Sequence, residues 1–422
     1  MNVSAHRAFS FLRTYGYERV SCSKEERTVA EALLNECTSL GVSAQLEEFT
    51  VPCGRVSHAL LRVTSPYVKE YEVTGYERAA STPEGGLETE FLYVENADEV
   101  LLERAKGKIV LVNGYLNRAT YEKLRKAEAA AILTFTGRTI DRESESDLNR
   151  CKLRETLTEP FGAVSVLNMR AASAAEIVRR GAKTVHIELT GECYDGTSQN
   201  VCATIPGTDK PSEVITLGGH YDSVYFSSGV HDNLSGSVIV LELLRYFAAH
   251  PPRRTLRFCW FGSEEQGLLG SKAYVKAHAD ELKACVAMLN FDVAAPTLGS
   301  NHLVTLATDD ALHYVAGVLR EAGYGVRAKQ DTYSSDCIPF ADNGVPAINL
   351  ARFGANGADY MHNRHDSLKS GYLDEHALDI TLQQGFVLLE RLANAASFPI
   401  KREIAPEIRQ KVDEYLFKAK KE

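Results

Sequence analysis

The stretch RTLRFCWFGSEEQGLLGS, residues 254–271, decides how the rest of the sequence is interpreted. Residues 255–261 form an apolar run that predicts a buried strand, and Glu264 and Glu265 follow where this strand should end. Adjacent carboxylates repel each other unless a positive charge lies beside them. The pair therefore indicates a metal ion, with one carboxylate as ligand and the other exchanging protons. Without further support, the pair is better explained as the solvated start of a helix near Gly267, because acidic residues favour a helix N-terminus.

Polar residues follow several other apolar runs of the chain. They are His220 and Asp222, Asp232, Asp292 in CVAMLNFDVA, and His362 with Asp366. Each lies where a strand is expected to give way to a loop. In open α/β sheets, ligands bind beyond the carboxyl ends of the strands, so we expect these separate segments to converge at one edge of a sheet.

The residue types suit a pair of zinc ions better than a single metal ion. Zinc binds imidazole nitrogen and carboxylate oxygen, and two ions about 3.5–4 Å apart need five protein ligands when one carboxylate bridges them. The candidate ligands are two histidines and three carboxylates: His220, Asp232, Glu265, Asp292 and His362. Asp222 follows His220 closely enough to accept the second N–H of that imidazole. Glu264 is left without a metal and is the natural proton shuttle.

In this order, these residues resemble the co-catalytic zinc exopeptidases of the aminopeptidase S and aminopeptidase Y type. That family also contains glutaminyl cyclases and the inactive ectodomain of the transferrin receptor. The blocks that carry the resemblance are His220-Tyr221-Asp222-Ser223, Asp232-Asn233, Glu264-Glu265, Asn290-Phe291-Asp292, Ser335-Asp336 with Pro339-Phe340, and His362 with Asp366. The resemblance implies that His220 and Asp292 bind one zinc ion. Glu265 and His362 would bind the other, with Asp232 bridging the two.

Two other histidines compete for these roles. His231 directly precedes Asp232, and His365 lies shortly after His362. In the family, the last histidine ligand is followed by an aspartate at the fourth position, and this frame selects His362 over His365. His231 is interpreted as a neighbour of the site and not as a ligand.

The position before the last histidine ligand departs from the family pattern. Some members carry a tyrosine there, whose hydroxyl helps to polarise the scissile carbonyl, but this sequence has Met361. Tyr360 and Tyr333 are candidate substitutes. Tyr333 is preferred, because it precedes the Ser335-Asp336 block on a segment that should approach the site. The alternative is that Tyr333 is an aromatic packing residue.

The resemblance implies an α/β fold with a mixed, mostly parallel sheet flanked by helices. This catalytic domain is expected to comprise residues 1–55 and 196–400. Residues 56–195 resemble the small, β-rich protease-associated domain inserted in many members, with strands at GKIVLVNG, AAAILTFTG and VHIELTG. Residues 401–422 are expected to form a helical tail, packed on the body or across a dimer contact, so a homo-oligomer is left open. Helices are expected at residues 25–40, 119–129, 236–249, 311–322 and 375–395.

Composition limits the partners and the compartment. The formal net charge of -9 argues against nucleic acid or an anionic membrane as partner, since either would favour a basic face. No stretch approaches the roughly 20 consecutive apolar residues of a membrane span. The first residues lack the apolar core of a secretory signal. The nine cysteines have no regular spacing and predict free thiols in a reducing cytoplasm.

Together these observations predict a zinc-dependent aminopeptidase that acts on peptides with a free N-terminus. A hydroxide held between two zinc ions would attack the first peptide bond, with Glu264 as general base. The substrate amino group would lie near the carboxylates of Glu264 and Asp292. The alternatives are a glutaminyl cyclase-like acyltransferase, usually with one zinc ion, and a non-catalytic binding protein of the same fold. The non-catalytic members of the family have lost metal ligands that are all present in this sequence.

Overall fold

The computed structural model describes residues 2–418, and its internal contacts divide the chain into two compact units. The first unit runs to Val51 and resumes at Thr197, and the second is Pro52–Gly196. The inserted domain expected at 56–195 falls within the second unit. The expected tail belongs to the first unit as far as it is described, since residues 419–422 lie outside the described part of the chain.

The first unit is built on a mixed, mostly parallel sheet, as expected from the sequence. Four central strands, in the order β14-β11-β9-β10, run parallel to one another. β12 is antiparallel to β14 at one side, and β8 is antiparallel to β10 at the other. The strands of this sheet are β13 (Arg327–Gln330), β12 (Gly299–Leu306), β14 (Ala347–Gly354), β11 (Cys285–Phe291), β9 (Lys210–His220), β10 (Arg254–Phe261), β8 (Thr184–Ile205) and β1 (Ser43–Ser65).

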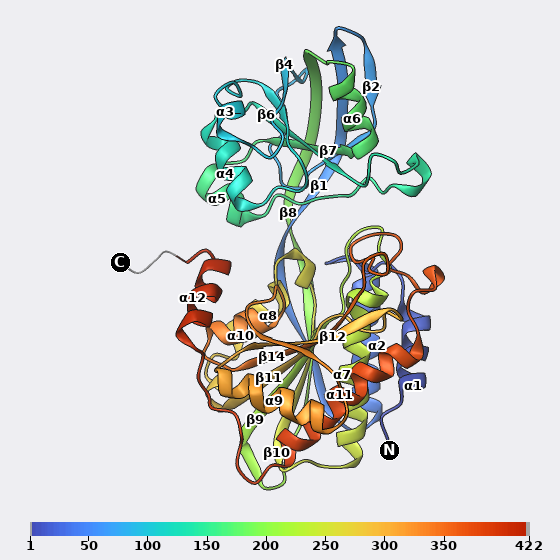
Figure 1. Cartoon of the computed structure of the whole chain (residues 1–422), viewed down its shortest axis with the longest axis vertical. Helices are drawn as coiled ribbons and strands as arrows, with labels where there is room; N and C mark the ends of the chain where they lie inside the picture. Colours follow the sequence, from blue (N-terminus) through green and yellow to red (C-terminus); the bar gives the residue numbers. More distant parts are fainter. Residues whose placement is uncertain (1, 419–422) are drawn as a thin grey trace. The chain divides into compact units, whose positions relative to one another are not determined.

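Helices cover both faces of this sheet, which explains why its strands are apolar throughout. In β10, Phe258 and Trp260 point into one hydrophobic core, and Cys259 and Phe261 point into another. Helices on the first face are α1 (Ala5–Tyr15), α2 (Lys24–Ser39), α7 (Ser235–Ala249), α9 (Asp309–Glu321) and α11 (Glu375–Asn394). Helices on the second are α8 (Leu269–Ala277), α10 (Cys337–Asp342) and α12 (Pro406–Tyr415). Figure 1 shows the two sets on opposite sides of the sheet.

The second unit alternates strands and helices around a smaller sheet. Four strands are mutually parallel: β4 (Leu87–Tyr93), β5 (Ile109–Leu111), β6 (Ala131–Thr136) and β7 (Ser165–Arg170). β3 (Val73–Gly75) pairs with β7, and β2 (Lys69–Tyr71) pairs with β1. The helices are α3 (Glu99–Leu102), α4 (Arg118–Lys126), α5 (Glu155–Phe161) and α6 (Ala171–Arg179). The strands expected at GKIVLVNG and AAAILTFTG are β5 and β6, and the helix between them is α4. That this unit is a protease-associated domain stays a prediction.

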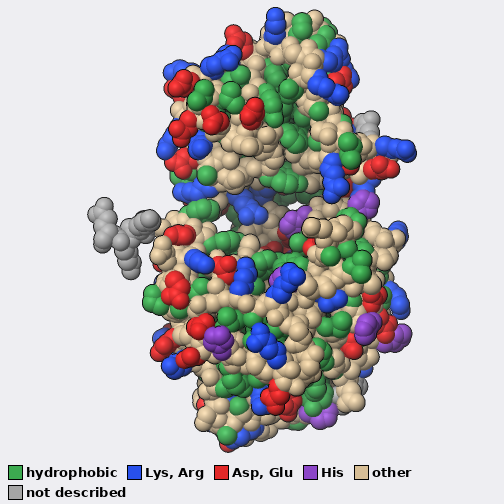
Figure 2. Space-filling model, viewed as in Figure 1, with side chains coloured by type: hydrophobic (Ala, Val, Ile, Leu, Met, Phe, Trp, Pro, Cys, Tyr) green, Lys and Arg blue, Asp and Glu red, His purple; other side chains and the backbone are tan. Residues whose placement is uncertain are grey.

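The surface mixes charges of both signs. On the face shown in Figure 2, Lys and Arg side chains are interspersed with Asp and Glu, and no extended patch of one sign stands out. None of the described helices combines the length and the apolar character that crossing a bilayer requires.

The C-terminal helix α12 packs on the first unit. Ile408 and Val412, one turn apart, are buried together with Phe340 of α10. We therefore expect Ile408→Ala to lower the free energy of unfolding by about 2–5 kcal/mol, the usual cost of emptying a buried aliphatic site. Gln410→Ala on the exposed side of the helix should change it by less than about 0.5 kcal/mol. Denaturant unfolding of both variants measures this, and equal effects would contradict the packing.

Candidate metal centre

Four neighbouring parallel strands deliver the predicted site residues to one edge of the sheet. His220 is the last residue of β9, and Asp292 directly follows β11. Glu265 lies in the short helical turn η3 (Glu264–Gln266) after β10, and His362 lies in the loop after β14. Asp232 comes from the turn η2 (Val230–Leu234) that leads into α7. The convergence expected from the sequence is thus a consequence of strand direction.

Among residues 2–418, two groups of side chains could each hold a metal ion, and they share Asp232. The first is His220, Asp232 and Asp292, and the second is Asp232, Glu265 and His362, with the donor atoms of each group within 4.8 Å of one another. Asp232 Oδ1 lies 3.1 Å from His220 Nε2, and Oδ2 lies 3.0 Å from His362 Nε2. One carboxylate therefore faces both histidines, and the structure brings all five predicted ligands together.

The charges of this cluster favour a bound cation. Burial raises the pKa of Glu264 well above its ordinary value against the effect of His220, and Glu265 adds to the rise. Burial likewise raises the pKa values of Glu265 and Asp292. For Asp232, hydrogen bonds from the two facing histidines outweigh burial, and its pKa lies below the ordinary value. Buried carboxylates are stable as anions only beside positive charge, and imidazole with carboxylate is a donor set that fits zinc.

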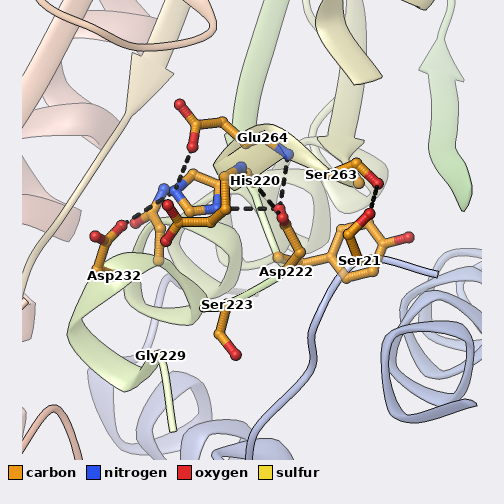
Figure 3. Close-up of polar contacts among 12 residues, drawn as sticks. Ser21, His220, Asp222, Ser223, Gly229, Asp232, Ser263 and Glu264 are labelled. Atoms are coloured by element: carbon orange, nitrogen blue, oxygen red, sulfur yellow. Dashed lines mark hydrogen bonds and ion pairs between the residues drawn. The ribbon is translucent and has the colours of Figure 1, made fainter. Parts of the chain in front are cut away.

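Asp222 ties the end of β9 to the turn that carries the glutamate pair. It is fully buried, and its Oδ1 and Oδ2 accept hydrogen bonds from the backbone N–H groups of Glu264 and Glu265, at 3.0 and 3.2 Å. Oδ1 also lies 3.4 Å from His220 Nδ1, the nitrogen turned away from Asp232. Figure 3 shows Asp222, Asp232 and Glu264 around the His220 ring. Asp222 therefore orients a ligand and the glutamate turn together.

Two residues hold the backbone of Asp232 in place, and the sequence alone did not reveal how. Asp366 accepts the backbone N–H groups of His231 and Asp232 on its two carboxylate oxygens, at 2.7 and 3.0 Å. Asn233 donates to the Phe291 carbonyl at 2.8 Å and accepts the N–H of Val293 at 3.0 Å. The peptide bond between Asp232 and Asn233 is cis. These contacts fasten the shared carboxylate to the end of β11 and to the loop after β14.

The competing histidines belong to neither group of potential ligands. His231 is buried, and its Nδ1 lies 2.7 Å from the Ala294 carbonyl oxygen. His365 is exposed, and its ring lies 5.5 Å from that of Tyr360. His362 is the histidine that the structure places against Asp232.

Tyr333 lies close to the charged cluster. Burial raises the pKa of its hydroxyl well above the ordinary value, and the carboxylates of Asp292 and Asp232 raise it further. Its ring also packs edge-on against Phe353, at 5.6 Å between centroids. Tyr360, the other candidate, donates its hydroxyl to the Gly357 carbonyl within its own loop. Tyr333 is therefore the better placed of the two, and its role in the reaction stays a prediction.

Fold and site define an α/β protein with two potential metal sites joined by one carboxylate. Residues 200–383 match the family described as Peptidase family M28, which confirms the family resemblance stated on the motif residues. The chain is similar to aminopeptidase YwaD of Bacillus subtilis, with 29% identity over 58% of this chain and 53% of that one. It is also similar to leupeptin-inactivating enzyme 1 of Streptomyces exfoliatus, with 36% identity over 43% of this chain and 41% of that one.

A solved structure extends the similarity of fold to both units. The zinc aminopeptidase BSAP of Bacillus subtilis superimposes with a TM-score of 0.77 over 96% of this chain and 99% of that one, at 21% sequence identity. The match to the curated relatives is shorter, at about half of their length or less. The α/β architecture is therefore shared, whereas the activity of the whole chain is a matter for proposal.

The contacts of Asp222 predict the effect of Asp222→Asn. The new amide must turn its NH2 group toward the N–H of Glu264 or of Glu265, donor against donor. We expect a loss of about 1–3 kcal/mol in the free energy of unfolding and zinc affinity about 10–100-fold weaker. Chelator competition measures the affinity. The matched control is Glu242→Gln, because Glu242 is equally buried but binds Arg7 and the Ser4 N–H away from the ligands. It should lose stability alone, and unchanged zinc affinity in Asp222→Asn would refute the role of Asp222.

Proposed function

We propose that the chain is a zinc-dependent aminopeptidase, which removes the N-terminal residue of peptides. The observation that carries this proposal is the single carboxylate of Asp232 between two sets of nitrogen and oxygen donors. Similarity to family M28 and to proteins named aminopeptidases supports peptide hydrolysis as the reaction.

Two zinc ions fit these donors best. His220 and Asp292 would hold one ion and Glu265 and His362 the other, each together with one oxygen of Asp232. The shared carboxylate supports this count, because it offers one oxygen to each histidine partner. When bound, zinc ions lower the pKa of a water molecule and polarise the scissile carbonyl.

Glu264 is the proton carrier in this proposal. Its carboxylate lies 3.8 Å from His220 Nε2, beside the donor groups but a member of neither. Its backbone N–H donates to Asp222, which fixes the turn from which the side chain extends toward His220. It would accept a proton from the attacking water and deliver it to the leaving amine, which becomes the new N-terminus of the shortened peptide.

Carboxylates near the reacting bond favour a substrate with a free, positively charged amino group. Glu264 and Asp292 are both largely buried beside His220, so once bound metal ions keep them ionised, their attraction for an ammonium group would be weakly screened by water. The Tyr333 hydroxyl, near Asp292, would contact the carbonyl oxygen of the bond that is broken. Acetylation of the substrate amino group removes the charge, and the proposal requires this to abolish turnover.

A reducing cytoplasm remains our proposed compartment. It is supported by the number and irregular spacing of the nine cysteines in the sequence. Most of these cysteines are buried among hydrophobic residues and serve as small core side chains.

A substrate panel tests the proposed reaction. Aminoacyl chromogenic amides with free and with acetylated amino groups are compared, with and without a chelator. We expect only the free amides to be hydrolysed, the chelator to stop hydrolysis, and added zinc to restore it. Equal hydrolysis of acetylated amides would contradict the aminopeptidase proposal, and cyclisation of an N-terminal glutaminyl peptide without hydrolysis would favour an acyltransferase.

The adjacent glutamates should respond differently to the same substitution. Glu264→Gln cannot accept a proton but leaves the donor groups intact, so zinc content should persist while kcat falls by at least about 10²-fold. Glu265→Gln removes a ligand, so zinc content should fall with activity and excess zinc should restore part of both. Metal analysis and steady-state kinetics of the two variants decide the matter. Loss of metal in Glu264→Gln with full metal in Glu265→Gln would show that the two roles are reversed.

A further inference from the structure

Arg19 is a buried cation that binds backbone carbonyl groups. It lies between α1 and α2, and none of its surface is exposed. Its Nε donates to the Tyr221 carbonyl at 2.7 Å, Nη1 to Ser228 at 2.6 Å, and Nη2 to Gly229 at 2.9 Å. Nη1 also donates to the carbonyls of Tyr15 and Tyr17 in its own segment. Within residues 2–418, Arg19 takes part in none of the ion pairs found.

The three distant carbonyls belong to one loop, residues 221–229, which joins two proposed ligands. Tyr221 follows His220, and Gly229 precedes the turn that carries Asp232. The guanidinium therefore forms hydrogen bonds with both ends of this loop. The backbone of Arg19 also binds Ser223 within the loop: the Arg19 N–H donates to Ser223 Oγ at 2.9 Å, and the Ser223 N–H donates to the Arg19 carbonyl at 3.1 Å. Figure 3 shows Ser223 and Gly229 below His220 and Asp232.

The charge of Arg19 also acts on the site. Burial lowers the pKa of Arg19 to about 10, although Asp366 and Asp222 oppose the change, so the guanidinium stays protonated at neutral pH. Burying an arginine without a direct carboxylate partner is costly unless its N–H groups are all used. Here the hydrogen bonds to carbonyl groups offset that cost, and the positive charge of Arg19 interacts with the nearby carboxylates of Asp366 and Asp222.

We propose that Arg19 is a positioning residue for the metal centre. By fixing both ends of loop 221–229, it holds His220 Nε2 and Asp232 Oδ1 at their separation of 3.1 Å, so that both can face one ion. This inference rests on the proposed function, because it presumes that the site binds zinc. Lysine cannot replace arginine here, because its single nitrogen cannot reach the Tyr221 and Gly229 carbonyls as the planar guanidinium fork does.

Zinc affinity and the absorption spectrum of the cobalt-substituted protein test this proposal in the full chain. Arg19→Lys should bind zinc at least about tenfold more weakly, the lower end of the effect of losing a residue that orients ligands. Its cobalt spectrum should shift, because the geometry of the donors changes.

Arg254→Lys is the matched control. Arg254 is also fully buried and also binds backbone carbonyls, those of Leu392 and Ala395, in addition to an ion pair with Glu213. It lies at the start of β10, whereas the glutamate turn follows the end of that strand. This variant should lower the melting temperature while zinc affinity and the cobalt spectrum stay unchanged. The comparison separates loss of stability from loss of ligand geometry.

Each outcome bears on a different claim. If the wild-type chain binds no zinc, the proposed function and the role of Arg19 both fail. If the wild-type chain binds zinc and Arg19→Lys matches it in affinity and spectrum, only the role of Arg19 fails. If Arg19→Lys does not fold, the test is Ser223→Ala, which removes the hydrogen bond between the Arg19 N–H and loop 221–229. Weaker zinc binding by this variant supports the proposal, and unchanged binding overturns it.

Discussion

The carboxylate of Asp232 is the constraint on which the site depends, because it must face two histidines at once. Its two oxygens lie 3.1 Å from His220 Nε2 and 3.0 Å from His362 Nε2. Hydrogen bonds of the neighbouring backbone keep this carboxylate between its two partners. Asp366 holds its N–H, and Asn233 fastens the following peptide to the end of β11. Asp366 and Asn233 thus act together to orient the Asp232 side chain.

Strand spacing explains why the other ligands can reach Asp232. β9 lies between β10 and β11, and neighbouring strands are about 4.8 Å apart. The register places Phe261, the last residue of β10, opposite His220, so the glutamate turn begins beside this histidine. On the other neighbour of β9, Asn290 of β11 lies opposite Gly218. Asp292, two residues further along, is therefore level with His220. Helices on both faces bury these strands and prevent the register from slipping.

The sequence predicted the parts of this structure that depend on local pattern. Apolar runs followed by His, Asp or Glu marked the strand ends, and helical periodicity located α2, α7, α9 and α11 to within a few residues. It assigned no role to Arg19, because the carbonyl groups that this side chain binds lie more than two hundred residues away in the chain. It also missed α1, although Ser4 caps this helix and its apolar residues lie on one face. Asp366 was part of a recognised motif, but the spacing of that motif in the sequence did not reveal its hydrogen bond with the Asp232 N–H. That contact becomes visible only in the tertiary structure.

The distribution of charge links metal binding to folding. Burial raises the pKa values of Glu264, Glu265 and Asp292, so the folded chain resists carrying these side chains as anions. Arg19 supplies one fixed positive charge, but its hydrogen bonds go to carbonyl groups, and the groups that face the carboxylates directly are the imidazoles of His220 and His362. A bound metal ion would add further positive charge among these carboxylates, and its binding free energy would then count toward the stability of the fold. In this proposal the arginine and the metal have separate roles: the arginine fixes the loop, and the metal ions would compensate the negative charge of the carboxylates beside it.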